Sequence, residues 1–201
     1  MNREELKKWS KDKIKGNVLK IFAACIIVSL ITSITIEVEN EVAGLAITLS
    51  FALIGYILQI GLTKFMVNFI NDKKHEIEMI FEYFKDWKRI ILSYLHQMLN
   101  IVLWSLLLII PGNIKALGYS LAPYILAEDD KISAKDANKL SEEMMNGHKA
   151  DLFMLQLSFI GWHLLSVFTL FLLEIWVIPY QQTATTKFLY EIKNNYKKAN
   201  L

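Results

Sequence analysis

The sequence predicts an all-α membrane protein, a polytopic helical bundle of about six transmembrane helices with short interfacial helices on its cytoplasmic side. Three observations predict this class. The chain of 201 residues is 54% hydrophobic, above the share of about 45–50% that is typical of soluble domains. Its apolar residues form long blocks with almost no charge, and each block approaches the roughly 20 residues that one bilayer span needs. Lysine and arginine residues cluster between these blocks in an uneven way that predicts an orientation.

The first segment, residues 2–16, is basic and amphipathic, with Leu6, Trp9 and Ile14 near one face. We expect it to lie in the headgroup region, with its apolar side in lipid and its lysines near anionic headgroups. Gly16-Asn17 separates it from the first apolar block. Because no small-x-small cleavage site precedes the acidic loop that follows, we interpret this block as a retained signal anchor.

The first two spans are predicted at 18–36 and 42–63, on either side of the acidic loop Glu37–Glu41. Small residues allow transmembrane helices to approach closely. The second span contains three such positions, namely Gly44, Gly55 and Gly61.

The middle of the chain predicts an interfacial helix and two further spans. Residues 71–89 are polar and basic, but apolar side chains recur in them at helical spacing. The third span is predicted at 90–110 and closed by Pro111-Gly112. The fourth, 113–127, is short: a 15-residue helix covers only about 22 Å. It either crosses a locally thinned bilayer or lies partly inside the bundle.

The last part of the chain predicts a cytoplasmic helix and a final pair of spans. Ser133 with Asp136 forms a capping-box-like start, and Asn146-Gly147 forms a stop. Residues 150–190 as one helix would extend about 60 Å, twice the hydrocarbon thickness. We therefore divide them into spans at 151–167 and 170–190, with a turn near Phe168-Thr169.

The positions of the basic residues predict the topology. Twenty of the 22 lysines and arginines lie on one side of the six-span topology, within residues 3–20, 73–89, 131–149 and 187–198. Only Lys64 and Lys115 fall elsewhere. By the positive-inside rule the basic side is cytoplasmic. We therefore expect a multi-pass protein of the plasma membrane with both termini in the cytoplasm, and the census favours a crossing by 113–127.

Composition also bears on partners and cofactors. The net charge is only +2, and no basic soluble module is present, so we expect no nucleic-acid partner. The single cysteine, Cys25, forms neither an intramolecular disulfide nor a CxxC site and is interpreted as a small packing residue. We expect no cofactor, no metal site and no enzymatic activity. The expected partners are the lipid bilayer and, through association, other membrane proteins or a second copy.

Four stretches carry a family resemblance: Leu103–Lys115 (LWSLLLIIPGNIK), Tyr119–Glu128 (YSLAPYILAE), Ser133–Leu165 and Pro179-Tyr180. In combination and in this order, they resemble the bacterial integral membrane family catalogued as domain of unknown function 975. The resemblance implies a multi-span bacterial membrane protein, typically of Gram-positive organisms. It brings no established activity and no defined active site, so it implies no functional residue. A glycine-bearing turn is expected before the last span, and Phe168–Leu173 contains none.

Four polar residues inside predicted spans are candidate functional residues: Glu174, His96, Asn100 and His163. Ionisable groups are costly in a bilayer and are therefore functional candidates. Glu174 is either a proton or cation ligand in a transport path or an interfacial acid that reaches water, paired with Lys115. His96, Asn100 and His163 either line a polar pathway or form interhelical hydrogen bonds, worth about 0.6 kcal/mol each on average.

Two functions follow from these alternatives. The first is a non-enzymatic membrane protein that binds a partner or lipid, or supports the cell envelope. The second is a small transporter or channel with an intramembrane polar pathway. Convergence of Glu174, His96 and His163 on one wet cavity favours transport, whereas separate helix contacts favour partner binding. An intramembrane enzyme is the weakest hypothesis, since the sequence contains no GxSxG or HExxH motif.

Overall fold

The computed structural model describes residues 2–33, 40–107 and 109–199, with side chains for all of these except 106, 107, 109 and 110. Within these ranges every regular element is a helix, which confirms the predicted all-α class. In chain order the elements are α1 (Arg3–Lys13), α2 (Val18–Thr32), α3 (Glu41–Ile70), the 3₁₀ helix η1 (Ile77–Asp86), α4 (Trp87–Leu107), α5 (Ile109–Gly118), α6 (Ala122–Glu128), α7 (Ala134–Met144), α8 (Lys149–Leu157), α9 (Ile160–Phe168) and α10 (Glu174–Ala199).

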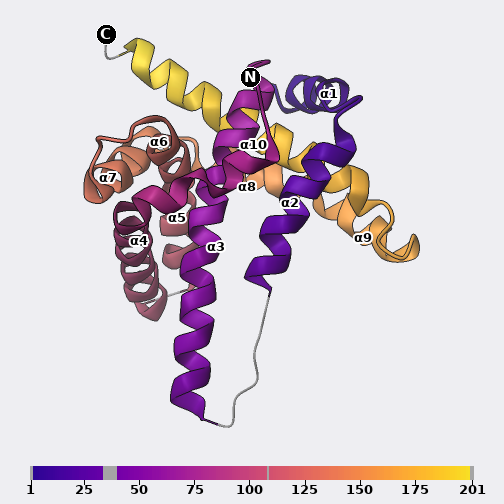
Figure 1. The fold of residues 1–201 in the computed structure, drawn as a ribbon. Helices are drawn as coiled ribbons and strands as arrows, with labels where there is room; N and C mark the ends of the chain where they lie inside the picture. The colour runs from indigo at the N-terminus through magenta and orange to yellow at the C-terminus, as the bar shows by residue number, and fades with distance from the viewer. Residues whose placement is uncertain (1, 34–39, 108, 200–201) are drawn as a thin grey trace.

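The apolar helices form three hairpins, α2 with α3, α4 with α5, and α9 with α10 (Figure 1). Figure 1 shows α2–α3 and α4–α5 extending downward from the end of the molecule that carries the N and C labels, whereas α9 and the turn after it extend to the side. That end, which we call the base, contains α1, η1, α6, α7 and the C-terminal parts of α3 and α10. Helix α3 contacts α2, η1, α4, α6 and α10, so it is the central element of the fold.

Two glycines of α3 allow neighbouring helices to approach it closely. A Cβ on Gly61 would overlap the backbone of Ile80 in η1, and a Cβ on Gly55 would overlap the side chain of Thr32 in α2. Only glycine leaves room for these contacts. In contrast, a Cβ on Gly44 would meet no atom of another element within 4 Å, which places this position outside the packed region.

Helix α3 has two different halves. Its 30 residues extend about 45 Å, beyond the predicted end of the span at residue 63. The C-terminal half is buried in the base, where Phe65 and Met66 are inaccessible. The N-terminal half presents apolar side chains outward, with Val42 78% and Leu45 62% exposed. Such a surface is typical of a helix that contacts lipid.

The base has an apolar core of its own, and α1 is part of it. Leu6 and Ile14 are fully buried, packed in a cluster with Phe65, Ile80 and Phe159. The predicted amphipathic helix is therefore confirmed, but its apolar face contacts protein, mainly α10, where we expected lipid. After Gly16, whose φ is +81°, the chain turns by 101° into α2.

Other predicted boundaries differ in detail. The third span was predicted to continue to residue 110 and end at Pro111-Gly112, but α4 ends at Leu107 and Pro111 lies in the first turn of α5, where proline is tolerated. The segment 113–127 is broken into α5 and α6. The segment 151–167 is broken at Ser158 into α8 and α9. Part of the predicted first span, residues 34–36, lies outside the described residues.

The last predicted turn is present, at residues 169–173. It contains no glycine; instead Leu170 and Phe171 adopt left-handed φ values of +49° and +64°. Such values are strained for non-glycine residues. The turn is also apolar and open, with Phe168 86% and Leu170 84% exposed.

Two helical stretches are long and apolar enough to cross a membrane, namely α3 and the 20 residues Lys149–Phe168, which include α8 and α9. The bent pair of α1 and α2 qualifies as a third when it is taken together. By length and composition, therefore, two or three helical units of the described chain meet the requirement for a span.

Candidate functional site

The structure places His163 and Glu174 together, across the turn between α9 and α10. His163 Nδ1 lies 2.9 Å from Glu174 Oε1, and His163 Nε2 lies 2.6 Å from Gln181 Oε1. The Glu174 side chain is only 17% exposed and that of His163 38%. Both ring nitrogens of the imidazole thus contact side-chain oxygen atoms on α10. This arrangement ties the two arms of the hairpin together.

His96 and Asn100 belong to a separate cluster, between α4 and α7. The centre of this cluster is Asn138 of α7, which is fully buried. Its Oδ1 accepts hydrogen bonds of 2.7 Å from both Ser93 Oγ and Gln97 Nε2. Its Nδ2 donates to the Ser93 carbonyl at 3.0 Å and lies 3.2 Å from His96 Nδ1. Asn138 therefore fastens α7 to α4.

The shortest hydrogen bond of Asn100 lies within α4 and does not join two helices. Its Nδ2 donates to the backbone carbonyl of His96, on the same helix, at 2.7 Å. The sequence reading of His96 and Asn100 as neighbours on one face is correct. Asn138 was missed because it lies in a polar helix, where an asparagine carries no signal of burial.

The four predicted residues thus form two groups on different helix pairs, at α9–α10 and at α4–α7. The predicted pairing of Glu174 with Lys115 is wrong. Lys115 pairs instead with Glu142 of α7, with 2.6 Å between Nζ and Oε1. The reason is the break between α5 and α6, which brings Lys115 toward α7; Ser141 Oγ donates to the Gly118 carbonyl at 2.7 Å in the same region.

A polar cavity of about 180 Å³ lies between α3, α6, α8 and α10, and none of the four predicted residues lines it. Its walls carry uncharged polar side chains from each helix or its flanking turn. They are Gln59, Thr63, Ser120, Gln156, Gln182 and Thr185. The sequence signal was a polar residue in each of several apolar runs, but only the fold shows that they face one another.

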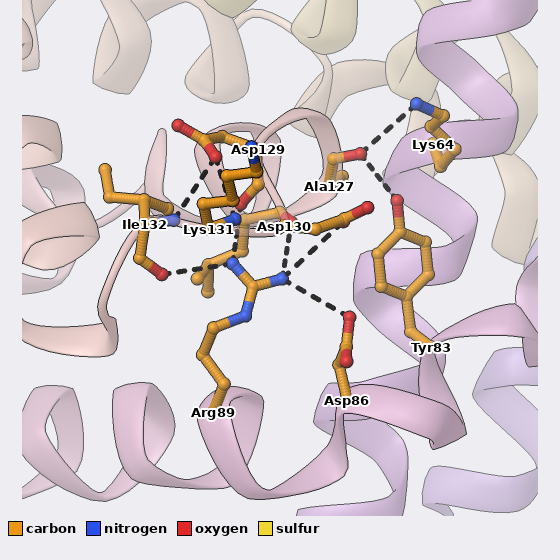
Figure 2. A network of polar contacts seen from close by, with 10 residues as sticks. Lys64, Tyr83, Asp86, Arg89, Ala127, Asp129, Asp130, Lys131 and Ile132 are labelled. Carbon is orange, nitrogen blue, oxygen red and sulfur yellow. Dashed lines mark hydrogen bonds and ion pairs between the residues drawn. The ribbon is translucent and has the colours of Figure 1, made fainter.

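The C-terminus of α6 is surrounded by cations. Figure 2 shows Lys64 Nζ and the Tyr83 hydroxyl donating to the Ala127 carbonyl, at 3.2 and 2.5 Å. From α10, Lys193 donates to the Tyr124 carbonyl at 3.2 Å and pairs with Glu128 at 2.6 Å. The last carbonyls of a helix have no partner within it and form its negative end. These cations and the hydroxyl supply the missing donors.

Arg89 extends this network into the loop after α6. Its guanidinium donates to the carbonyls of Leu126, Asp129 and Ile132, at 3.2, 2.6 and 3.2 Å. Figure 2 shows the same group between the carboxylates of Asp86 and Asp130, at 3.7 and 3.8 Å. Arg89 is therefore the residue that joins the start of α4 to the loop.

Burial changes two pKa values in this network. Removal from water raises the pKa of the Tyr83 phenol above its ordinary value. Burial also lowers the pKa of Lys193, while the adjacent Glu128 carboxylate opposes that change. The Lys193 side chain is only 3% exposed. Buried cations of this kind are retained when they are paired and hydrogen-bonded, so the network has a structural role at the base.

In the part of the chain that the structure describes, no three histidine, cysteine or acidic side chains come together as a metal site would require. Cys25 is buried in the base core. No curated protein and no solved structure matches the chain. A family model does match, over residues 97–196, and its description is a protein of unknown function, DUF975. The resemblance predicted from the sequence is therefore confirmed, since residues 97–196 match the model of the DUF975 family.

Proposed function

We propose that this chain is an integral protein of the plasma membrane that acts by binding lipid or a membrane partner, without catalysis. Six apolar segments, arranged as the three hairpins, enter the bilayer from a cytoplasmic base that carries both termini. This proposal retains the six predicted apolar segments and the cytoplasmic position of both termini.

The distribution of charge supports this orientation. Lys64 and Lys115 are the two basic residues that the predicted topology did not place on the cytoplasmic side. Both nevertheless contact residues in or next to the segment 128–149, which it places there. Lys64 donates to the Ala127 carbonyl beside Glu128, and Lys115 pairs with Glu142. At the opposite end, the turn at residues 169–173 contains no charged residue and exposes Leu170 and Phe171. An exposed apolar turn and a basic base fit a molecule inserted from the cytoplasmic side.

The pairing of Lys115 with Glu142 also favours one of the two alternatives for residues 113–127. A residue at the outer surface would not reach α7, which the charge census assigns to the cytoplasm. We therefore propose that α5 returns inside the bundle and does not cross the whole bilayer. Broken helices at membrane depth are tolerated where protein covers them, and the Ser141 bond to Gly118 is such a cover.

The observation that carries the binding function is the separation of the two polar clusters. His163 and Glu174 satisfy each other at α9–α10, and His96 hydrogen-bonds Asn138 at α4–α7. A proton or ion pathway through these residues needs one continuous polar route. Two closed pairs on different helices are instead what interhelical hydrogen bonding produces.

The test uses membranes from an expressing strain and liposomes reconstituted with the purified protein. We expect the protein to stay in the membrane through alkaline extraction, and the liposomes to show no proton or potassium flux above protein-free liposomes. Release by alkaline carbonate would contradict the membrane assignment. A flux that Glu174→Gln abolishes would contradict the binding function and support a transport path through that carboxylate.

A second candidate function, a small transporter, is favoured by the polar cavity between α3, α6, α8 and α10. Uncharged groups from several helices, next to the break between α5 and α6, resemble the substrate sites of transporters with discontinuous helices. Its ligand would be a small uncharged polar solute. Solute uptake by the liposomes that is lost in Gln156→Leu but kept in Glu174→Gln would establish this function in place of the first.

A further inference from the structure

An apolar groove of about 600 Å³ lies between α5 and α8. Its walls include Ile114 and Leu117 from α5, and Ala150 and Phe153 from α8. Ile114 is 47% and Phe153 51% exposed, so the groove opens to the surroundings. Its volume lies within the range of about 300–1,000 Å³ that is usual for ligand sites.

One end of the groove is cationic. Lys149 lines both the groove and an adjoining polar pocket of about 360 Å³. The pocket also contains two ion pairs, Lys115 with Glu142 at 2.6 Å and Lys139 with Glu143 at 3.9 Å. Lys149 itself forms no ion pair with any residue in the described ranges. The pocket therefore holds one positive charge in excess, at the point where it meets the apolar walls.

The position of Lys149 relates this charge to the bilayer. Lys149 is the first residue of α8, and its Nζ lies beside Gly118, the last residue of α5, about 3.3 Å from where a Cβ would stand. Phe153 lies about one turn further along α8. Under the topology proposed above, Lys149 is at the cytoplasmic headgroup level and the apolar walls extend from it toward hydrocarbon.

We propose that this groove binds an anionic phospholipid of the cytoplasmic leaflet, with its phosphate on Lys149 and an acyl chain along Ile114, Leu117 and Phe153. The assignment rests on the proposed membrane function and on charge complementarity. A single unbalanced ammonium at the end of an apolar groove matches a molecule that joins one anionic headgroup to an alkyl chain. The two glutamates do not oppose the lipid, because each is neutralised by its own lysine.

Native mass spectrometry of the detergent-solubilised full chain tests the site, with phosphatidylglycerol and phosphatidylcholine titrated separately. We expect wild type to bind phosphatidylglycerol about fivefold more tightly than phosphatidylcholine, the effect of about one lysine near an anionic surface. Lys149→Gln should remove this preference. Lys135→Gln makes the same change of charge on α7, outside the groove, and should keep it. Ala150→Trp fills the groove and should weaken both lipids, whereas Leu157→Trp, further along α8, should not.

Equal binding of the two lipids to wild type, or a Lys149→Gln variant that behaves like Lys135→Gln, would overturn the proposal. So would a dimer that Ala150→Trp abolishes, since the groove would then belong to a second copy. Alkaline extraction of the same membranes is scored independently. A protein that stays in the membrane but shows no lipid preference refutes only the lipid site, while a protein released by carbonate refutes the membrane function itself.

Discussion

His163 and Glu174 are joined across the turn between α9 and α10, with 2.9 Å between Nδ1 and Oε1. The pair closes a hairpin whose turn carries two left-handed apolar residues, Leu170 and Phe171. A strained turn persists when surrounding contacts fix it, and the histidine bridge to Glu174 and Gln181 is such a contact.

Loss of this pair should destabilise the hairpin by a modest amount. Interhelical hydrogen bonds in membranes contribute about 0.6 kcal/mol on average and up to about 1.7 kcal/mol. We expect His163→Ala and Glu174→Gln each to lower the free energy of unfolding within that range, and the double variant to lose less than the sum. Unfolding in mixed micelles measures this coupling. Leu164→Ala, at a 62% exposed site on α9, is the control. Strictly additive losses would show that the two side chains do not interact.

Removal of Asn138 should have a larger effect. Asn138 is fully buried, and its Oδ1 accepts hydrogen bonds from Ser93 and Gln97. Asn138→Ala would remove the acceptor of the Ser93 hydroxyl and one of the three hydrogen bonds of Gln97 Nε2, at a cost of about 1–3 kcal/mol. The adjacent Lys139→Ala, whose side chain is 75% exposed, should change stability by less than about 0.5 kcal/mol. Proteolytic sensitivity of the α6–α7 loop is a second readout, because α7 should detach from α4. Equal stability of the two variants would contradict the role of Asn138.

Tyr83 should make stability depend on alkaline pH. Its hydroxyl donates to the Ala127 carbonyl, and burial raises its pKa, so the folded state holds this proton more tightly than the unfolded state. The resulting stability is fully present below the unfolded pKa of about 10 and is lost as pH rises through the folded value. Tyr83→Phe should cost about 1 kcal/mol at neutral pH. The difference between wild type and variant should shrink above about pH 10; a difference that is constant with pH would contradict this account.

Two glycines of α3 provide a matched pair for the packing. A Cβ on Gly61 would overlap the backbone of Ile80, whereas Gly44 has open space around it. Gly61→Ala should therefore destabilise by about 1–3 kcal/mol through overpacking. Gly44→Ala should be neutral or stabilising, by up to about 1 kcal/mol of helix propensity. Thermal unfolding in detergent distinguishes the two. Equal tolerance at both sites would show that α3 and η1 are not packed as described.

Local features of the fold were predictable from the sequence. The helix at 134–144 was predictable from the residues at its two ends. Ser133 caps its start by accepting a hydrogen bond from the Asp136 backbone N–H, and Gly147 follows its end with a φ of +82°. The last turn was also predictable, since two spans cannot share one helix of that length. These signals depend on neighbours in sequence, which the chain displays directly.

Features set by tertiary register were not predictable. Leu6 and Ile14 form an amphipathic face whether lipid or α10 covers it, so the sequence could not decide between them. The cation cluster at the end of α6 joins Lys64, Arg89 and Lys193 from three separate helices, and no spacing rule connects them. The pairing of Lys115 with Glu142 was missed for the same reason, because it depends on the break between α5 and α6.

Cysteine accessibility shows whether the hairpins enter the bilayer from a cytoplasmic base. Single cysteines at Glu41 and Lys139, in a Cys25→Ala background, are labelled with a membrane-impermeant maleimide in right-side-out and inverted vesicles. We expect Glu41→Cys to be labelled only in right-side-out vesicles and Lys139→Cys only in inverted vesicles. Labelling of both residues from the same side would contradict this orientation.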